Sequence, residues 1–191
     1  MNISTMAAST LRPMTTGIEL ADFMASHGGS LGGTFHCPVY MGVRMLWDYD
    51  TDECFSAEGV ILPEAEHLKP QLRLIADEVL RETGVQAGMD GILVKVKDSP
   101  CHFRIIDLAS PELSLWRQVN LLTDLAASLE SELPHVRPAQ HFHTPSVKSE
   151  KQLTRWLKTW KRPGLGGIYI KEAEMIYSPG VSSSQWCFVK V

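Results

Sequence analysis

Hydrophobic and polar residues alternate along residues 35–49, FHCPVYMGVRMLWDY. Because successive side chains of a strand point to opposite faces, this alternation predicts a strand with one buried and one mostly outward face. Pro38 has no amide proton and Gly42 weakens a strand interior, so we expect an edge strand, a bulge or a hairpin bend there. The set expected in the core comprises Phe35, Cys37, Val39, Met41, Val43, Met45, Trp47 and Tyr49.

Apolar residues at three- and four-residue steps predict four helices elsewhere in the chain. Gly84 is a typical helix stop, and Ser110 is a typical N-cap before a proline. Ser149 and Gln152 form a capping-box pattern at the start of the last helix. The predicted helices cover residues 18–27, 63–83, about 110–133 and 149–161.

Short runs rich in β-branched and aromatic residues predict further strands, two of them joined by a turn at residues 98–100. These strands span residues 54–62, 91–97, 101–108, 168–177 and 185–191. Hairpins dominate, and strands do not alternate with crossover helices. We therefore predict an α+β fold, with an antiparallel sheet built from hairpins and helices packed on one face.

The length of 191 residues suits one domain, which we expect over residues 16–191. A Ser/Thr-rich mobile tail is expected over residues 1–15, and the proline-broken loop 134–147 is a candidate sub-boundary. The chain contains no run of about 18 apolar residues and no signal-peptide pattern, so we expect a soluble protein with no membrane contact. Four widely spaced cysteines without a CxxC pair indicate free thiols in a cytoplasmic compartment.

The glycine-rich run 28–33 leads into a predicted strand, whereas phosphate-binding loops lead into a helix. We therefore expect no cofactor. Cys37 has a histidine-bearing segment far downstream, which makes a catalytic thiol with His141 or His143 one hypothesis. A metal site is another, because three histidines lie within nine residues: His135, His141 and His143.

The most distinctive charge feature is the segment 148–162, KSEKQLTRWLKTWKR, whose six basic residues and one acidic residue give a net charge of +5. On a helix its basic residues form one stripe and its apolar residues the opposite face. We expect a contact with an anion or a partner there. The candidate binding residues are Lys151, Arg155, Lys158, Arg162, Trp156 and Trp160.

Since no complete catalytic motif is found, the favoured prediction is a non-enzymatic binding protein. Its partner would be a polyanion or an acidic protein surface, engaged through segment 148–162. A thiol-dependent hydrolase or transferase using Cys37 is the first alternative. The second follows from the order of elements over residues 18–133, which is similar to that of type III secretion chaperones and implies a homodimer.

Overall fold

The computed structural model describes residues 17–180 and 183–191. The α+β fold with mostly antiparallel strands is confirmed, and the strands are divided between two sheets. The predicted mobile tail 1–15 lies outside the described residues. Among the described residues, every helix is too short or too polar to span a bilayer.

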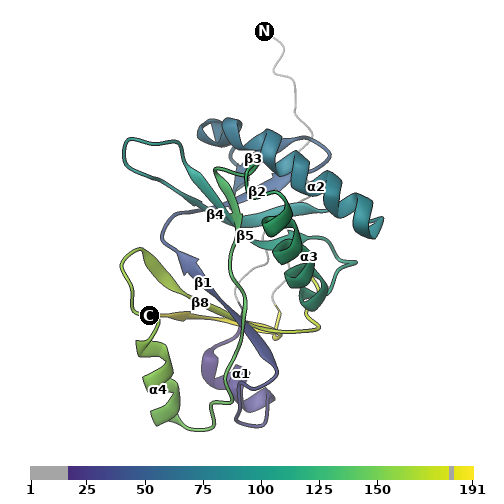
Figure 1. Ribbon diagram of the computed structural model, residues 1–191. Helices are drawn as coiled ribbons and strands as arrows, with labels where there is room; N and C mark the ends of the chain where they lie inside the picture. Colours follow the sequence, from purple (N-terminus) through teal and green to yellow (C-terminus); the bar gives the residue numbers. More distant parts are fainter. Residues whose placement is uncertain (1–16, 181–182) are drawn as a thin grey trace.

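The first sheet has five strands in the order β3-β2-β4-β5-β6 and lies in the upper half of Figure 1. Its pairs are antiparallel except for β5 and β6, which are parallel. The bounds are β2 Val43–Asp48, β3 Glu53–Ser56, β4 Gly88–Val94, β5 His102–Ala109 and β6 Val136–Pro138.

The second sheet has four antiparallel strands in the order β7-β1-β8-β9. Its strands come from distant parts of the chain, so the early strand β1 pairs with β8 near the C-terminus. The bounds are β1 Thr34–Tyr40, β7 Phe142–His143, β8 Leu165–Glu172 and β9 Trp186–Lys190.

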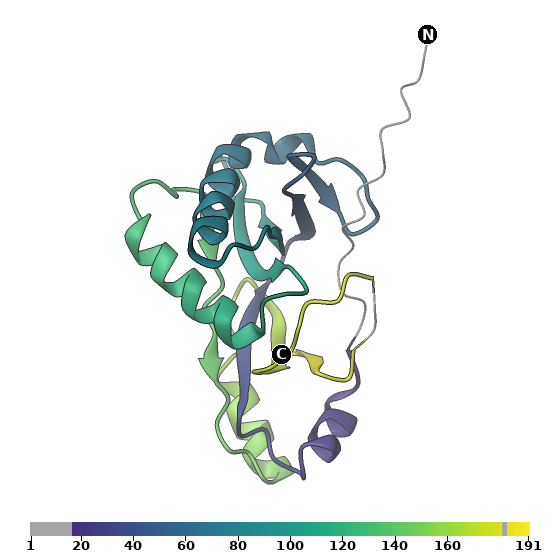
Figure 2. The same cartoon turned by 90° about the vertical axis from the view of Figure 1, so that its right-hand side faces the viewer.

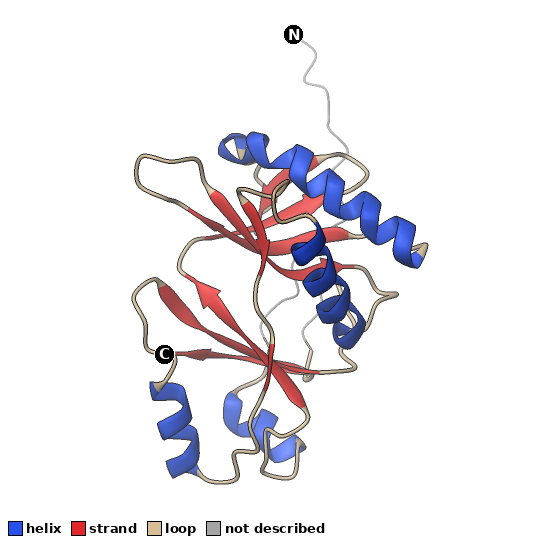
Figure 3. Ribbon diagram, in the orientation of Figure 1, coloured by secondary structure: helices blue, strands red, loops and turns tan. Residues whose placement is uncertain are grey.

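Helices cover the outer side of each sheet, as Figure 3 shows. Three hydrophobic clusters follow: one between the five-stranded sheet and α2 and α3, one between the two sheets, and one between the four-stranded sheet and α1 and α4. The bounds are α1 Leu20–Ser26, the 3-10 helix η1 Pro63–Leu68, α2 Lys69–Thr83, α3 Leu115–Ser128 and α4 Glu150–Lys158.

The stretch 35–49 breaks at the expected place but does not form a hairpin. β1 belongs to the four-stranded sheet and β2 to the five-stranded one, so the chain passes between the two halves there (Figure 2). Gly42 sits in this passage, where an added Cβ would lie 2.3 Å from the carbonyl oxygen of Leu93. The outward face predicted for β1 is wrong, because α4 covers it and His36 is only 4% exposed.

Other element boundaries also differ from the sequence prediction. The third helix begins at Leu115 rather than at Ser110, because residues 110–114 form a turn in which the Ser110 hydroxyl accepts a hydrogen bond from the Glu112 amide. The loop 134–147 contains β6 and β7 and links the two sheets.

Candidate functional site

A buried charge network lies between the two sheets. Arg44 of β2 donates to both carboxylate oxygens of Asp90 on β4, at 2.9 and 2.7 Å, and the Tyr177 hydroxyl donates to the same carboxylate at 2.8 Å. Asp90 has no exposed surface. Burial alone would lower the pKa of Arg44, but the charge of Asp90 reverses the effect and raises it. The Asp90 carboxylate therefore accepts hydrogen bonds from both Arg44 and Tyr177 inside the protein.

A second buried pair spans the two sheets. Lys171 of β8 donates to both carboxylate oxygens of Asp107 on β5, at 2.6 and 2.7 Å, and both residues are 1% exposed. A nucleophilic amine must be neutral and accessible. The ammonium of Lys171 is instead held between two oxygens, so its role in this structure is to join the sheets.

An open hollow of about 280 Å³ lies beside Arg44. Three aromatic residues of the four-stranded sheet line it together with the guanidinium: Tyr169, Trp186 and Phe188. The indole Nε1 of Trp186 is buried and has no hydrogen-bond partner among the described residues. Phe188 is 45% exposed, although it lies on a strand. Stacking surfaces beside a cation are typical of sites for planar anionic ligands.

Cys37 lies in the core between the sheets, as the alternation predicted, and has no exposed surface. Burial raises the pKa of its thiol to about 12. His141 is hydrogen-bonded through Nδ1 to the Ala139 carbonyl oxygen, and burial lowers its pKa to about 3. His143 packs on Phe35 at 4.6 Å between ring centroids. No hydrogen bond joins Cys37 to a histidine within the described ranges, so the geometry of an activated thiol is missing there.

The three candidate metal-binding histidines are not gathered. His135 lies beside the five-stranded sheet against the rings of His67 and His102, whereas His141 and His143 lie at the four-stranded sheet. Within residues 17–180 and 183–191, no group of three or more His, Cys, Asp or Glu side chains is arranged to hold a metal ion.

The basic helix α4 forms where the capping pattern predicted it. The Ser149 hydroxyl accepts from the Gln152 amide, and the Gln152 side chain accepts from the Lys148 amide. Three cations project into solvent around a shallow surface hollow: Lys151, Arg155 and Lys158. Arg162 is exposed just beyond the helix. These four side chains form no ion pair with any carboxylate whose position the structure describes.

Trp156 of α4 and Trp160, two residues after its end, face differently from the basic residues of this segment. Their rings contact the His36 ring at 5.0 and 4.9 Å, in the cluster beneath the four-stranded sheet. Burial lowers the pKa of His36 to about 4. The two tryptophans therefore anchor α4 on the sheet and leave the basic stripe facing outward.

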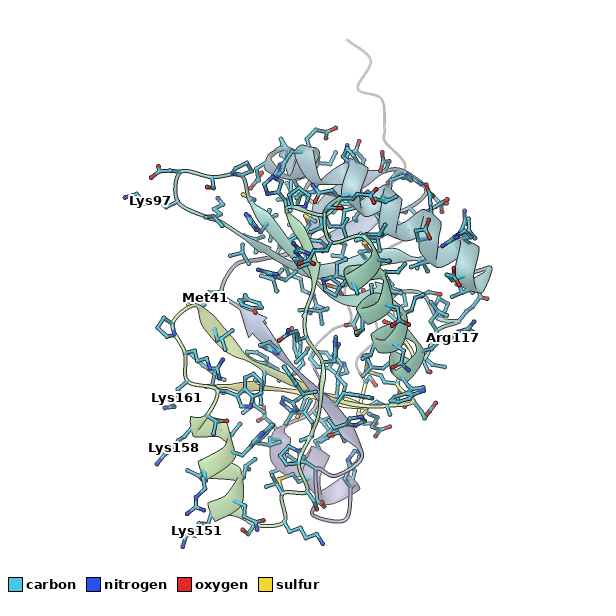
Figure 4. The ribbon with its side chains drawn as sticks, in the orientation of Figure 1. Met41, Lys97, Arg117, Lys151, Lys158 and Lys161 are labelled. Carbon is cyan, nitrogen blue, oxygen red and sulfur yellow. The ribbon has the colours of Figure 1, made fainter. Side chains whose placement is uncertain are left out.

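Several lysines lie along one side of the molecule. Figure 4 shows Lys97 at the tip of the β4–β5 hairpin, and Lys161, Lys158 and Lys151 along the α4 region of the same side. Met41 lies between these two groups, where β1 passes into β2. A row of exposed cations attracts a polyanion over several charges at once.

No family model matches the chain, and no curated protein matches it in sequence. Solved structures do. The chain resembles a structure of Lig E DNA ligases (TM-score 0.62, 15% identity, 94% of this chain and 68% of that one). It also resembles the ATP-dependent DNA ligase of bacteriophage T7 in complex with ATP (TM-score 0.63, 14% identity, 94% and 68%). A third likeness is to Pmar-Lig_PreS3 (TM-score 0.67, 16% identity, 95% and 46%).

The chain shares the fold of DNA ligases. It spans about half to two thirds of the length of these structures. This likeness overturns two expectations: the non-enzymatic binding protein, with both of its alternatives, and the protein or unspecified polyanion as partner. The neighbours are enzymes of nucleic acid, and the work on Lig E concerns DNA binding.

Sequence reasoning missed the two buried charge networks. A charged residue within an otherwise apolar strand could have indicated these networks, as in Ile-Ile-Asp107-Leu and Ile-Tyr-Ile-Lys171. Such residues are almost never buried unless they are paired. The pairing itself could not be read from the sequence, because Lys171 and Asp107 are 64 positions apart.

Proposed function

We propose that this protein acts on nucleic acid, which it binds along the side that carries α4 and the β4–β5 hairpin. The observation that carries the proposal is the exposed basic stripe of α4, set on a fold that the chain shares with DNA ligases. The structurally similar DNA ligases suggest nucleic acid as the partner. The basic stripe of α4 supplies cations for the phosphates of the nucleic acid.

The charge distribution supports this assignment. The whole chain carries a net charge of −4, yet the segment 148–162 carries +5. A helix that presents Lys151, Arg155 and Lys158 to solvent can follow phosphates without reading bases. Binding of this kind should depend strongly on salt and little on sequence.

Fluorescence anisotropy with duplex and single-stranded oligonucleotides, over a range of salt concentrations, tests the proposal. Replacing Lys151, Arg155 and Lys158 together by Ala should reduce the slope of log affinity against log salt by about 2 to 3 for duplex DNA. Arg155→Ala alone should weaken binding, whereas the matched variant Arg117→Ala, on the opposite side of the molecule in Figure 4, should not. Equal effects of both single variants would contradict the assignment.

A nucleotide site between the sheets is a second candidate function, favoured by the hollow at Arg44. The T7 neighbour is a complex with ATP. Tyr169, Trp186 and Phe188 offer ring surfaces for a base, and within the described part of the chain the Trp186 indole lacks a hydrogen-bond partner. We propose that this hollow binds the base of a nucleotide, with Arg44 near its anionic part.

Phe188 is the safest position at which to test this site, because it is 45% exposed. Loss of one aromatic–base stack costs about 1–3 kcal/mol, so Phe188→Ala should weaken ATP binding about 5-fold or more. Phe142→Ala, a matched change at a residue 39% exposed outside the hollow, should leave ATP binding unchanged. Peptide mapping after incubation with ATP and Mg²⁺ should find no adenylate on Lys171, because Asp107 holds its ammonium.

We also propose a cytoplasmic, reducing compartment. Support comes from the four cysteines, all of which are free and three of which are buried. Measuring free thiols in the protein purified without reductant tests this proposal.

A further inference from the structure

Two arginines lie side by side at one edge of the five-stranded sheet. Arg104 of β5 and Arg137 of β6 are register partners, so their side chains leave the same face of the sheet. Their neighbours Phe103 and Val136 have no exposed surface and pack on the opposite face, towards α2 and α3. Both arginines are half-buried.

Neither guanidinium has a counterion among residues 17–180 and 183–191. No carboxylate of the described residues forms an ion pair with Arg104 or Arg137. The Tyr40 ring lies beside Arg104, with its centroid 5.4 Å from the guanidinium Cζ. Like charges on neighbouring strands destabilise a sheet. A bound anion would offset the repulsion between the two guanidinium groups.

The pair opens into a hollow of about 460 Å³. Tyr40 and the exposed amide side chain of Gln140 line it beside the two arginines, and the flank of α3 closes one side. The one acidic residue in the lining is Glu130, which is exposed and forms no ion pair with either arginine. The volume leaves room for an oxyanion together with the organic group that carries it.

We propose that Arg104 and Arg137 form a binding site for a phosphate monoester. Guanidinium groups match phosphate oxygens with pairs of parallel hydrogen bonds. A monoester carries a charge of about −1.5 to −2 near neutral pH, which suits two adjacent cations better than the single charge of a diester.

Two sources carry this chemistry, a free nucleotide and the phosphorylated end of a nucleic-acid strand. Only the choice of these two sources rests on the proposed function; the phosphate site itself rests on the unpaired arginines. The phosphate site and the proposed nucleic-acid function are tested by separate experiments.

Thermal unfolding with inorganic phosphate tests the site alone. In phosphate-free buffer, Arg104→Gln and Arg137→Gln should be at least as stable as the wild type, because each removes a like-charge repulsion. Added phosphate at constant ionic strength should raise the Tm of the wild type and of the control Arg117→Gln but not that of the two variants. Equal shifts in all four proteins would overturn the proposal.

Binding of AMP and of one oligonucleotide with either a 5′-phosphate or a 5′-hydroxyl end distinguishes the sources. Arg137→Gln should weaken binding of the phosphate-bearing ligand about 10-fold and leave the affinity for the strand with a 5′-hydroxyl end unchanged. Loss confined to AMP identifies a nucleotide, and loss confined to the 5′-phosphate strand identifies a strand end. Unchanged affinity of Arg104→Gln and Arg137→Gln for both AMP and the 5′-phosphate strand overturns the site. If α4 does not bind nucleic acid, both oligonucleotides would bind equally weakly. The measurements with AMP and with inorganic phosphate would still test the site at Arg104 and Arg137.

Discussion

Removing one partner of the Lys171–Asp107 pair should strongly destabilise the protein. Both residues are 1% exposed, and each carboxylate oxygen accepts a hydrogen bond of 2.7 Å or less from the ammonium. Lys171→Met would leave a buried carboxylate without its cation, at a cost of about 3–5 kcal/mol. That loss is a large part of the about 5–15 kcal/mol by which a domain is stable.

The double variant Lys171→Met with Asp107→Leu is the matched test. Because it removes both charges, it should recover most of the lost stability. The free energy of unfolding would be measured by urea titration, followed by tryptophan fluorescence. The loss in the single variant, relative to the wild type at the same pH, should shrink as the pH falls towards 4, because the orphaned carboxylate can then take up a proton. A single-variant loss below about 1 kcal/mol, or a double variant no more stable than Lys171→Met, would refute the reasoning.

Three further predictions concern acid stability, close packing and thiol reactivity. Burial lowers the pKa of His36 from 6.5 to about 4. Stability should therefore be full above pH 6.5 and fall by about 3 kcal/mol as the pH drops to 4; His36→Phe should reduce that fall in urea titrations. Gly42→Ala should cost about 1–3 kcal/mol in the same assay, whereas Gly166→Ala, whose added Cβ would meet nothing nearer than 3.7 Å, should cost little. A thiol reagent at neutral pH should label half-buried Cys101 in the native protein and leave Cys37 unlabelled until unfolding; rapid labelling of Cys37 would contradict its burial.

Local signals were read well from the sequence. The helix that ends at Gly84 does so because this glycine adopts a left-handed conformation at φ 73°. The capping pattern at Ser149 places the start of α4, and the turn between β4 and β5 places Asp98 at φ 59°. Each of these features depends on residues within a few positions of one another, so short-range hydrogen bonding and sterics determine them.

The inner face of β1 also followed from alternation, but its outer face did not. His36 is buried because α4, more than 100 residues away, covers that side with Trp156 and Trp160. Both tryptophans pack on His36, and their expected contact with a partner stays a prediction. A residue's exposure depends on which element covers it, and single-strand alternation contains no such information.

The sequence alone determined the α+β class, most of the helices and strands, and the basic stripe of α4, because periodicity and charge are local properties of the chain. Only the tertiary structure decided that the strands form two facing sheets, that Lys171 meets Asp107, and that Arg104 lies beside Arg137. Pairing between distant strands sets these contacts. It depends on the joint burial of surfaces from the whole chain, and no short segment encodes it.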